Sequence, residues 1–502
     1  MEILQNLLTG FEIALSLKNL AFCFMGVTLG TLIGVLPGIG PVTGVAILIP
    51  ITFGMDATTA IITMAGVYYG AMYGGSTTSI LINVPGESAS VMTTLDGYQM
   101  ALKGRAGPAL GMAAIASFIA GTFSIIMLSW IAPVLADYAV AFGPPEYFAL
   151  TFMGLTLVTG LAGDSLIKGL MSGAFGLLLA CVGVDAISGS PRFIFGSIYL
   201  LDGLGFIGVA VGLFALAEVL VNIEEPLKQV FVKTKLNMKT LFPNRQDWKD
   251  SAGALWRGSI LGFFVGVLPG AGATVASFLS YATEKKLSKH PEKFGTGVIE
   301  GVAGPEGANN SAAGGAMVPL LTLGIPGSGT TAVLMGALLI HGIRPGPLLF
   351  QEHPEVVWGL IASMYIGNVL LLILNLPLVG MWVSFLKVPY QILMPLIVTI
   401  SAVGVFATDN NIFDMWIMFG AGIVGYVMRK LDFPAAPVVL ALVLGPMVER
   451  SLRQSLTISH GDISIFFTRP ISAVLTTFAL LSLFAPLVRK FWRTYRRAKM
   501  EQ

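Results

Sequence analysis

The sequence predicts an all-α polytopic membrane protein with two inverted-topology repeats, built from broken helices or helical hairpins and roughly ten to thirteen membrane segments. Three observations support this prediction. Hydrophobic residues make up 55% of the 502 residues and charged residues only 11%, whereas soluble domains carry about 25% charge. Mean hydropathy is +0.81, and apolar runs near the ~20 residues that span a bilayer recur along the chain. One motif that combines proline with glycine occurs once in each half.

The duplicated motif lies inside two apolar stretches. Residues 34–40 read Gly-Val-Leu-Pro-Gly-Ile-Gly and residues 266–272 read Gly-Val-Leu-Pro-Gly-Ala-Gly, a displacement of 266 − 34 = 232 positions. Proline removes a backbone donor and glycine relaxes the chain, so each copy predicts an interrupted helix. Interrupted hydrophobic segments at corresponding positions of two halves are typical of transporters and indicate a binding site near mid-membrane.

Further corresponding points follow in the same order along the two halves. They are Pro85 and Pro326 (326 − 85 = 241), Arg105 and Arg344 (344 − 105 = 239), Asp164 and Asp409 (409 − 164 = 245), and Asp185 and Asp432 (432 − 185 = 247). The slow drift of the displacement fits insertions in loops. We therefore predict a first membrane repeat at 1–221, a polar cytoplasmic linker at 222–257, a second membrane repeat at 258–450, and a final span with a basic cytoplasmic tail at 451–502.

The distribution of basic residues predicts how the halves are oriented. The linker contains seven Lys or Arg residues and the stretch 489–499 of the tail six, whereas only Lys18 precedes the first motif. Basic segments favour the cytoplasm, so the second repeat starts inside and the first outside, which favours inversion. If each break is a hairpin tip, basic Lys285 returns to the cytoplasm and Asp56 to the other side. A continuous kinked span would put Lys285 outside, and the sequence leaves both alternatives open.

The first pair of breaks supplies backbone groups for a binding site. Unwound helix in lipid is tolerated only where it is buried in protein or lines a wet cavity. Freed N–H groups at a helix start suit an anion, and freed carbonyl groups suit Na⁺. The alternative is a packing kink, because Gly and Pro are common in membrane helices. The candidate substrate-binding residues here are Pro37, Gly38, Gly40, Thr43, Pro269, Gly270, Gly272 and Thr274.

A second pair of breaks is richer in polar side chains. Hydroxyl and amide groups both donate and accept hydrogen bonds, so they suit carboxylate oxygens or a desolvated cation. Interhelical packing by small and hydroxyl residues is the alternative interpretation. The candidates are Ser76, Thr77, Asn83, Pro85, Gly86, Asn309, Asn310, Ser311, Pro326, Gly327, Ser328 and Thr330. Asp164 and Asp409 are weaker candidates for an ion or proton role, since they also fit the water-facing ends of spans.

Several classes of function lack their sequence signatures. The four histidines show no metal-ligand spacing, and no P-loop or Gly-x-Ser-x-Gly string occurs. We therefore predict no enzyme activity, no cofactor and no assigned metal site apart from Na⁺ near the breaks. The low charge also argues against a nucleic-acid surface.

The same residues resemble a known family. Residues 34–40, 68–76, 83–86, 266–272 and 304–312 look like the large membrane subunit (TctA-type) of tripartite tricarboxylate transporters. The resemblance covers nearly the whole chain, and the string Gly-Pro-Glu-Gly-Ala-Asn-Asn-Ser-Ala at 304–312 is its most specific part. It implies a secondary transporter driven by a Na⁺ or proton gradient, with elevator-like movement, that carries citrate or related carboxylates.

The resemblance also implies partners and a location. The partners are a small four-span membrane subunit (TctB-type) and a periplasmic substrate-binding protein (TctC-type), in the bacterial inner membrane, with the C-terminus in the cytoplasm. A passive anion channel is the alternative function, and it would show flux without saturation and without a capture protein. An intramembrane enzyme is a third class, which the missing nucleophile signatures disfavour.

Overall fold

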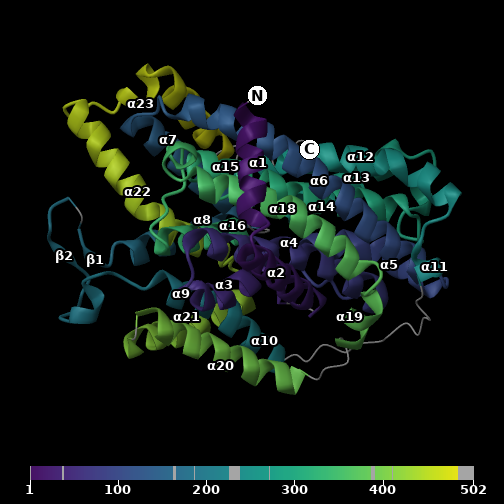
Figure 1. The fold of residues 1–502 in the computed structure, drawn as a ribbon. Coiled ribbons are helices and arrows are strands. Elements are labelled where there is room, and N and C mark those ends of the chain that lie inside the picture. The colour runs from purple at the N-terminus through teal and green to yellow at the C-terminus, as the bar shows by residue number, and fades with distance from the viewer. Residues whose placement is uncertain are drawn as a thin grey trace, which may run out of the picture.

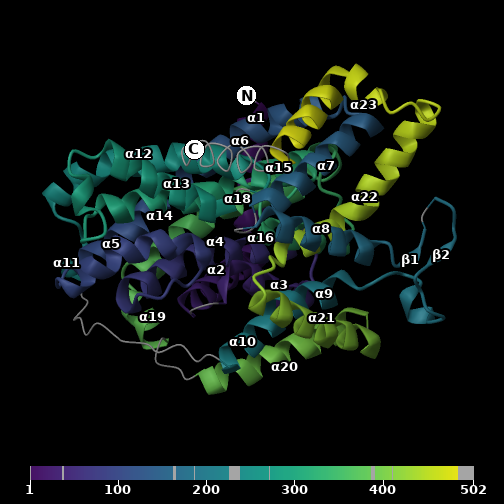
Figure 2. The ribbon, with the colours of Figure 1, turned by 180° about the vertical axis from the view of Figure 1, so that it is seen from behind.

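The computed structural model describes residues 2–36, 39–161, 165–185, 187–224, 238–270, 272–385, 390–409 and 411–483. Pro37, Gly38 and Asp164 lie outside these ranges, as does the side chain of Asp409. The described residues are predominantly helical (Figures 1 and 2). The exception in regular structure is the antiparallel pair of short strands β1 (Gly183–Val184) and β2 (Pro191–Arg192). The prediction of an all-α polytopic membrane fold is confirmed.

The helices of the first half are α1 (Glu2–Ala14), α2 (Leu17–Val35), α3 (Gly40–Thr52), α4 (Ala57–Ile82), α5 (Val91–Leu102), α6 (Ala106–Ala139), α7 (Pro144–Leu161), α8 (Leu166–Ala180), α9 (Phe206–Val211) and α10 (Ala217–Glu224). The short turns η1 (Ser88–Ser90) and η2 (Ile198–Leu200) are 3₁₀-helical, and the π-helical segment η3 (Gly212–Leu216) joins α9 to α10.

The second half contains α11 (Met238–Leu241), α12 (Arg245–Val267), α13 (Gly272–Leu287), η4 (Pro291–Lys293), α14 (Glu300–Gly315), α15 (Met317–Leu323), α16 (Gly329–Ile340), α17 (Leu349–Glu352), α18 (Pro354–Asn375), α19 (Val379–Phe385), α20 (Tyr390–Asp409), α21 (Ile412–Lys430), α22 (Ala436–Ile458) and α23 (Ile465–Thr468). A helix over Pro470–Leu483 follows.

Ten of the described helical segments are apolar enough to lie in a bilayer. Five are long enough to cross it: Leu17–Val35, Ala106–Ala139, Phe206–Glu224, Pro354–Asn375 and Ile412–Lys430. Five are shorter: Gly40–Thr52, Leu166–Ala180, Gly329–Ile340, Met394–Ala407 and Pro470–Leu483. Short apolar helices are expected where a chain breaks inside the membrane.

Each half contains one helix pair that packs backbone to backbone. In α2, a Cβ atom added to Gly26, Gly30 or Gly34 would lie 2.2–2.4 Å from a carbonyl oxygen of α4, namely that of Thr63, Val67 or Ala71. In α12, the same addition at Gly258, Gly262 or Gly266 would lie 2.2–2.3 Å from the carbonyl oxygen of Gly304, Ala308 or Ala312 in α14. Only glycine permits this approach, which is the small-residue packing typical of membrane helices. Corresponding glycines of α2 and α12 are 258 − 26 = 232 positions apart, as the two Gly-Val-Leu-Pro-Gly motifs are. Their partners in α4 and α14 are 304 − 63 = 241 positions apart, as Pro85 and Pro326 are.

The helices on either side of each Pro-Gly motif form a hairpin. At the base of the first hairpin, Lys18 at the start of α2 forms an ion pair with Asp56, which follows α3. At the base of the second, Arg257 Nε of α12 donates to Glu284 Oε1 of α13 over 2.8 Å. The two helices of each hairpin are therefore antiparallel, and α12 and α13 lie side by side in both views (Figures 1 and 2). Of the two alternatives that the sequence left open, the structure adopts the hairpin.

Candidate functional site

The second break of each half has the same local conformation. Helix α4 ends at Asn83, which is left-handed with φ 56°, and α15 ends at Gly324 with φ 67°. Glycine has no Cβ penalty there, and asparagine is among the few other residues that tolerate this region. A Pro-Gly pair follows each, and then a residue that caps the next helix. Glu87 Oε2 accepts from Ala89 N over 2.6 Å, and Ser328 Oγ accepts from Thr331 N over 3.2 Å.

The two breaks of each half lie against each other. In the second half, Gly270 N donates to Gly327 O over 3.0 Å, and a Cβ added to Gly272 would lie 3.5 Å from Ser328 Cβ. In the first half, a Cβ added to Gly40 would lie 3.8 Å from Glu87 Cβ. Helices α3 and α13 thus begin beside the loop that follows α4 and α15, respectively.

The breaks of the two halves also meet. Ser88 Oγ and Thr274 Oγ1 are 2.7 Å apart and share a hydrogen bond. The reciprocal contact brings Gly329 to Val42, where an added Cβ would lie 3.6 Å from Val42 Cγ2. These four residues correspond pairwise at the displacements of the repeat (274 − 42 = 232 and 329 − 88 = 241). All four breaks therefore converge, and we call the set Gly40, Val42, Glu87, Ser88, Gly270, Gly272, Thr274, Ser328 and Gly329 the break cluster.

The chemistry of the break cluster favours an anion. Three helices of 12 to 16 residues, α3, α13 and α16, begin within it, and a helix start presents unpaired N–H groups with a positive dipole end. Ser88 is exposed, and Thr274 and Ser328 are half-buried, so their hydroxyl groups are accessible. No Lys or Arg belongs to the cluster. The groups that the cluster offers to an anion are therefore backbone dipoles and hydroxyl groups.

The structure divides the sequence-predicted residues into two groups. Gly40, Gly270, Gly272, Thr274 and Ser328 belong to the break cluster. The backbones of Pro85, Gly86, Pro269, Pro326 and Gly327 form its loops, and Asn83 is the exposed residue that ends α4. Thr43 and Thr330 are buried on the first turns of α3 and α16.

The remaining candidates lie in a separate buried network around Glu306. Ser76 Oγ donates to Glu306 Oε2 over 2.7 Å, and Asn309 Nδ2 approaches the same oxygen at 3.4 Å. Asn310 Nδ2 donates to Ser117 Oγ over 2.7 Å. Ser311 bonds instead to the carbonyl group of Ser259 in α12 and thereby joins two helices, and Thr77 is buried on α4 beside Ser76.

Sequence reasoning missed several of these groups. Glu87 and Ser88 directly follow the recognised string at 83–86. The signal that singles out Glu87 is its capping position before a helix start. Thr93 and Ser117 contact Glu306 from α5 and α6. Hydroxyl residues in an apolar helix carry no local signal that separates a network partner from ordinary packing.

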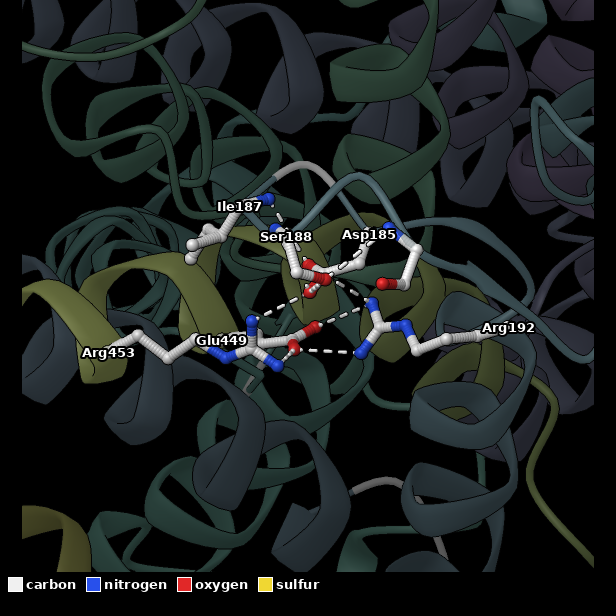
Figure 3. Close-up of polar contacts among 7 residues, drawn as sticks. Asp185, Ile187, Ser188, Arg192, Glu449 and Arg453 are labelled. Atoms are coloured by element: carbon white, nitrogen blue, oxygen red, sulfur yellow. Dashed lines mark hydrogen bonds and ion pairs between the residues drawn. The ribbon is translucent and has the colours of Figure 1, made fainter.

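A cavity beside the loop after α8 lies away from the break cluster. It has a volume of about 630 Å³ and is lined by parts of 179–206, 336–340 and 442–450. Ion pairs join the loop after α8 to α22 beside it (Figure 3). Arg453 Nη1 donates to Asp185 Oδ2 over 2.8 Å, and Arg192 Nη1 to Glu449 Oε1 over 2.8 Å. Hydrogen bonds from the Ser188 hydroxyl and the Arg453 guanidinium hold the pKa of Asp185 well below its usual range.

This low pKa leads to a prediction for the loop at 181–205. Asp185→Asn removes the charge that Arg453 meets, so the loop should exchange its amide hydrogens faster at neutral pH, as measured by mass spectrometry. In the wild type the stabilisation is complete above the unfolded pKa near 3.8 and is lost as the pH falls toward the lower folded pKa. Asp202→Asn, on the exposed part of the same loop, is the matched control. Equal amide exchange in the Asp185→Asn and Asp202→Asn variants would show that the Asp185–Arg453 ion pair does not hold the loop.

In the described residues, no group of three or more His, Cys, Asp or Glu side chains is placed to hold a metal ion. The fold and the site define a polytopic membrane protein whose discontinuous helices meet in one polar cluster. Secondary transporters are built on this class of structure.

Comparison with known proteins identifies the family within that class. Residues 20–440 match the model described as the tripartite tricarboxylate transporter TctA family. The chain therefore belongs to this family, and it is a subunit of a multi-component transporter.

Two relatives come from Agrobacterium vitis. One, described as an uncharacterized 52.8 kDa protein in the TAR-I ttuC′ 3′ region, is 50% identical over 481 residues, which cover 96% of this chain and 95% of the relative. The other, an uncharacterized protein in the TAR-II ttuC′ 3′ region, is 48% identical over 227 residues, covering 45% of this chain and 94% of the relative. No solved structure matches the chain.

Proposed function

We propose that this chain is the large membrane subunit of an ion-gradient-driven secondary transporter that imports tricarboxylate or related carboxylate anions. A periplasmic binding protein (TctC-type) delivers the anion, and a small four-span subunit (TctB-type) completes the membrane complex. Membership of the TctA family supports a transporter subunit with partners. The observation that carries the choice of substrate is the convergence of three helix starts and two hydroxyl groups in the break cluster.

The proposed binding mode uses backbone groups. Carboxylate oxygens accept hydrogen bonds from N–H groups at the starts of α3, α13 and α16, and from the hydroxyl groups of Ser88 and Thr274. A charged side chain is not needed, because the N–H dipoles at a helix start already favour a negative charge. The Ser88–Thr274 hydrogen bond joins the halves, so an anion bridging these groups replaces it.

We further propose that the two repeats are inverted in the inner membrane, with the C-terminus in the cytoplasm. The strands β1 and β2 lie at one end of the molecule and α11 at the opposite end in both views (Figures 1 and 2). Basic residues are frequent in the sequence that flanks α11, and Lys285 and Lys286 lie in the last turn of α13. The positive-inside rule therefore favours a cytoplasmic α11 and a periplasmic β1–β2 loop. The cavity of about 630 Å³ then faces the side from which the binding protein delivers substrate.

Transport by this arrangement is of the elevator type, with the hairpin-bearing domain moving against the remaining helices. The hairpins α2–α3 and α12–α13 carry five of the nine residues of the break cluster, and each packs through glycines on α4 or α14. Coupling requires that substrate and cation contact the two end states differently. Movement of the hairpin tips changes those contacts, because the tips carry the helix starts.

The test is uptake into proteoliposomes that contain both membrane subunits, with binding protein and radiolabelled citrate outside. We expect saturable uptake that requires the binding protein and collapses when both the Na⁺ and the proton gradient are dissipated. Competition by unlabelled di- and tricarboxylates then defines the substrate class. Saturable uptake that ignores both gradients refutes coupling, and non-saturating flux without binding protein favours the passive channel.

A further inference from the structure

Two buried carboxyl groups, Glu87 of the break cluster and Glu306 of the buried network, have no cationic partner among the described residues. Glu87 is 6% exposed and Glu306 is 0% exposed. None of the ion pairs between described residues includes either of them. A buried charge is expensive unless it is paired, hydrogen-bonded or neutralised. In membrane segments such groups usually belong to an ion or proton pathway.

The two carboxyl groups differ in how their oxygens are satisfied. Glu306 is surrounded by neutral donors from four side chains, those of Ser76, Thr93, Ser117 and Asn309. Glu87 accepts from the backbone of Ala89 through Oε2, but its Oε1 is buried and has no hydrogen-bond partner among the described residues. Glu306 is therefore solvated by the protein, whereas Glu87 has one oxygen free for a ligand.

The side chains around Glu87 leave it without a positive partner. Its side chain lies against Gly75 of α4, where an added Cβ would lie 2.9 Å from Glu87 Cγ. The preceding Gly86 faces the last turn of α2, and its added Cβ would lie 2.1 Å from Gly34 O. Carbonyl groups at a helix end carry the negative end of the dipole. The titratable groups that interact with Glu87 are Tyr68 of α4 and Glu306 of α14, and neither supplies a positive charge.

We propose that the free oxygen of Glu87 binds the coupling cation, as Na⁺ or as a proton, while Glu306 supplies a fixed negative charge that strengthens binding. The inference rests on the proposed function, since it names the coupling residue of that site. Position 328, which corresponds to Glu87 (328 − 87 = 241), is a serine. The cation site therefore exists in the first half alone, and the pseudo-symmetry of the cluster is broken at this residue.

The position of Glu87 explains how cation and anion binding are coupled. Its Cβ lies 3.8 Å from where a Cβ of Gly40 would be, so Glu87 stands next to the start of α3. An ionised Glu87 repels a carboxylate that approaches this helix start, since like charges in a low dielectric interact strongly. A bound Na⁺ or proton removes the repulsion. Each ligand therefore raises the affinity for the other, as linkage requires.

The test uses the purified full chain and cations alone. Thermal unfolding of the wild type is followed at fixed pH while NaCl replaces choline chloride at constant ionic strength, and again at fixed NaCl while the pH changes. A wild-type response to NaCl identifies Na⁺, and a response to pH alone identifies the proton. We expect Glu87→Gln to shift the half-maximal cation concentration at least tenfold or to abolish the response. Glu292→Gln, exposed on the loop after α13, is expected to respond as the wild type does.

The remaining variants keep the proposal open to refutation. Glu306→Gln is expected to weaken the response without removing it. If Glu87→Gln does not fold, Glu87→Asp preserves the charge on a shorter side chain and should shift the half-maximal concentration. A wild type that responds to neither cation, or a Glu87 variant with the full wild-type response, overturns the proposal. If Glu87→Gln leaves gradient-driven citrate uptake unchanged, this inference fails and the proposed function stands. If the cation response depends on Glu87 but no carboxylate is taken up, the proposed function fails and the cation site stands.

Discussion

Gly262→Val is expected to abolish the folded protein. In α12, even a Cβ at this position would lie 2.2 Å from the carbonyl oxygen of Ala308, well inside contact distance. The obstacle is the backbone of α14 and not a flexible side-chain end, so the helices must separate. Overpacking a tight interior costs ~1–3 kcal/mol and occasionally more, and a valine adds two further methyl groups. We expect most of the protein to be lost from the monodisperse fraction in detergent.

The matched control for this prediction is Gly420→Val. Gly420 lies in the middle of α21, is exposed, and has no neighbouring atom within 4 Å of an added Cβ. Valine and glycine differ little in helix propensity at such a position, with a small advantage for valine. Fluorescence-detected size-exclusion chromatography of tagged protein compares the two variants. Normal yield and unfolding temperature for Gly262→Val would show that α12 and α14 do not pack as described.

Gly270→Ala is expected to lower citrate uptake by at least tenfold while the protein stays folded. Gly270 has φ 84° and donates its N–H to Gly327 O across the two breaks of the second half. A left-handed conformation costs an L-residue roughly 1–2 kcal/mol. The strained tip therefore relaxes and displaces the start of α13 from the break cluster. A displacement of this kind changes binding and transport far more than it changes overall stability.

Gly295→Ala is the control that separates the general cost of a strained backbone from the effect of strain on the break cluster. Gly295 has φ 88°, lies in the loop after α13, and has open space around an added Cβ. It therefore carries the same backbone penalty at a distance from the cluster. Initial uptake rates, normalised to reconstituted protein, compare the two variants. Equal losses in both, or uptake of Gly270→Ala near the wild-type rate, would remove the hairpin tip from the binding site.

The comparison of sequence and structure is clearest at the two Pro-Gly motifs. The residues themselves predict that a helix stops, because proline removes a donor and glycine permits a positive φ. They do not predict where the chain goes next, since a kink and a hairpin share the same local chemistry. The ion pairs Lys18–Asp56 and Arg257–Glu284 at the hairpin bases decide that question.

The sequence locates only some of the residues of the break cluster, because local chemistry does not identify the partner of a polar group. Thr274 and Ser328 were identified from the polar residues near each break, and both belong to the break cluster. Asn309 and Asn310 were identified on the same grounds, yet they lie in the network around Glu306. Polar residues on an apolar helix show that a partner exists, because an unsatisfied group in hydrocarbon is costly. They do not show which partner it is.

The sequence by itself determined the class of this protein, the duplication of its broken helices and the family to which it belongs. Composition, apolar run length and repeated strings are local or one-dimensional properties, and they survive any arrangement of the helices. The tertiary structure alone decided that the breaks are hairpin tips, that all four meet, and that Glu87 is buried beside them with a free oxygen. Contacts such as Ser88–Thr274 join residues 274 − 88 = 186 positions apart, and such a pairing depends on how every intervening helix packs.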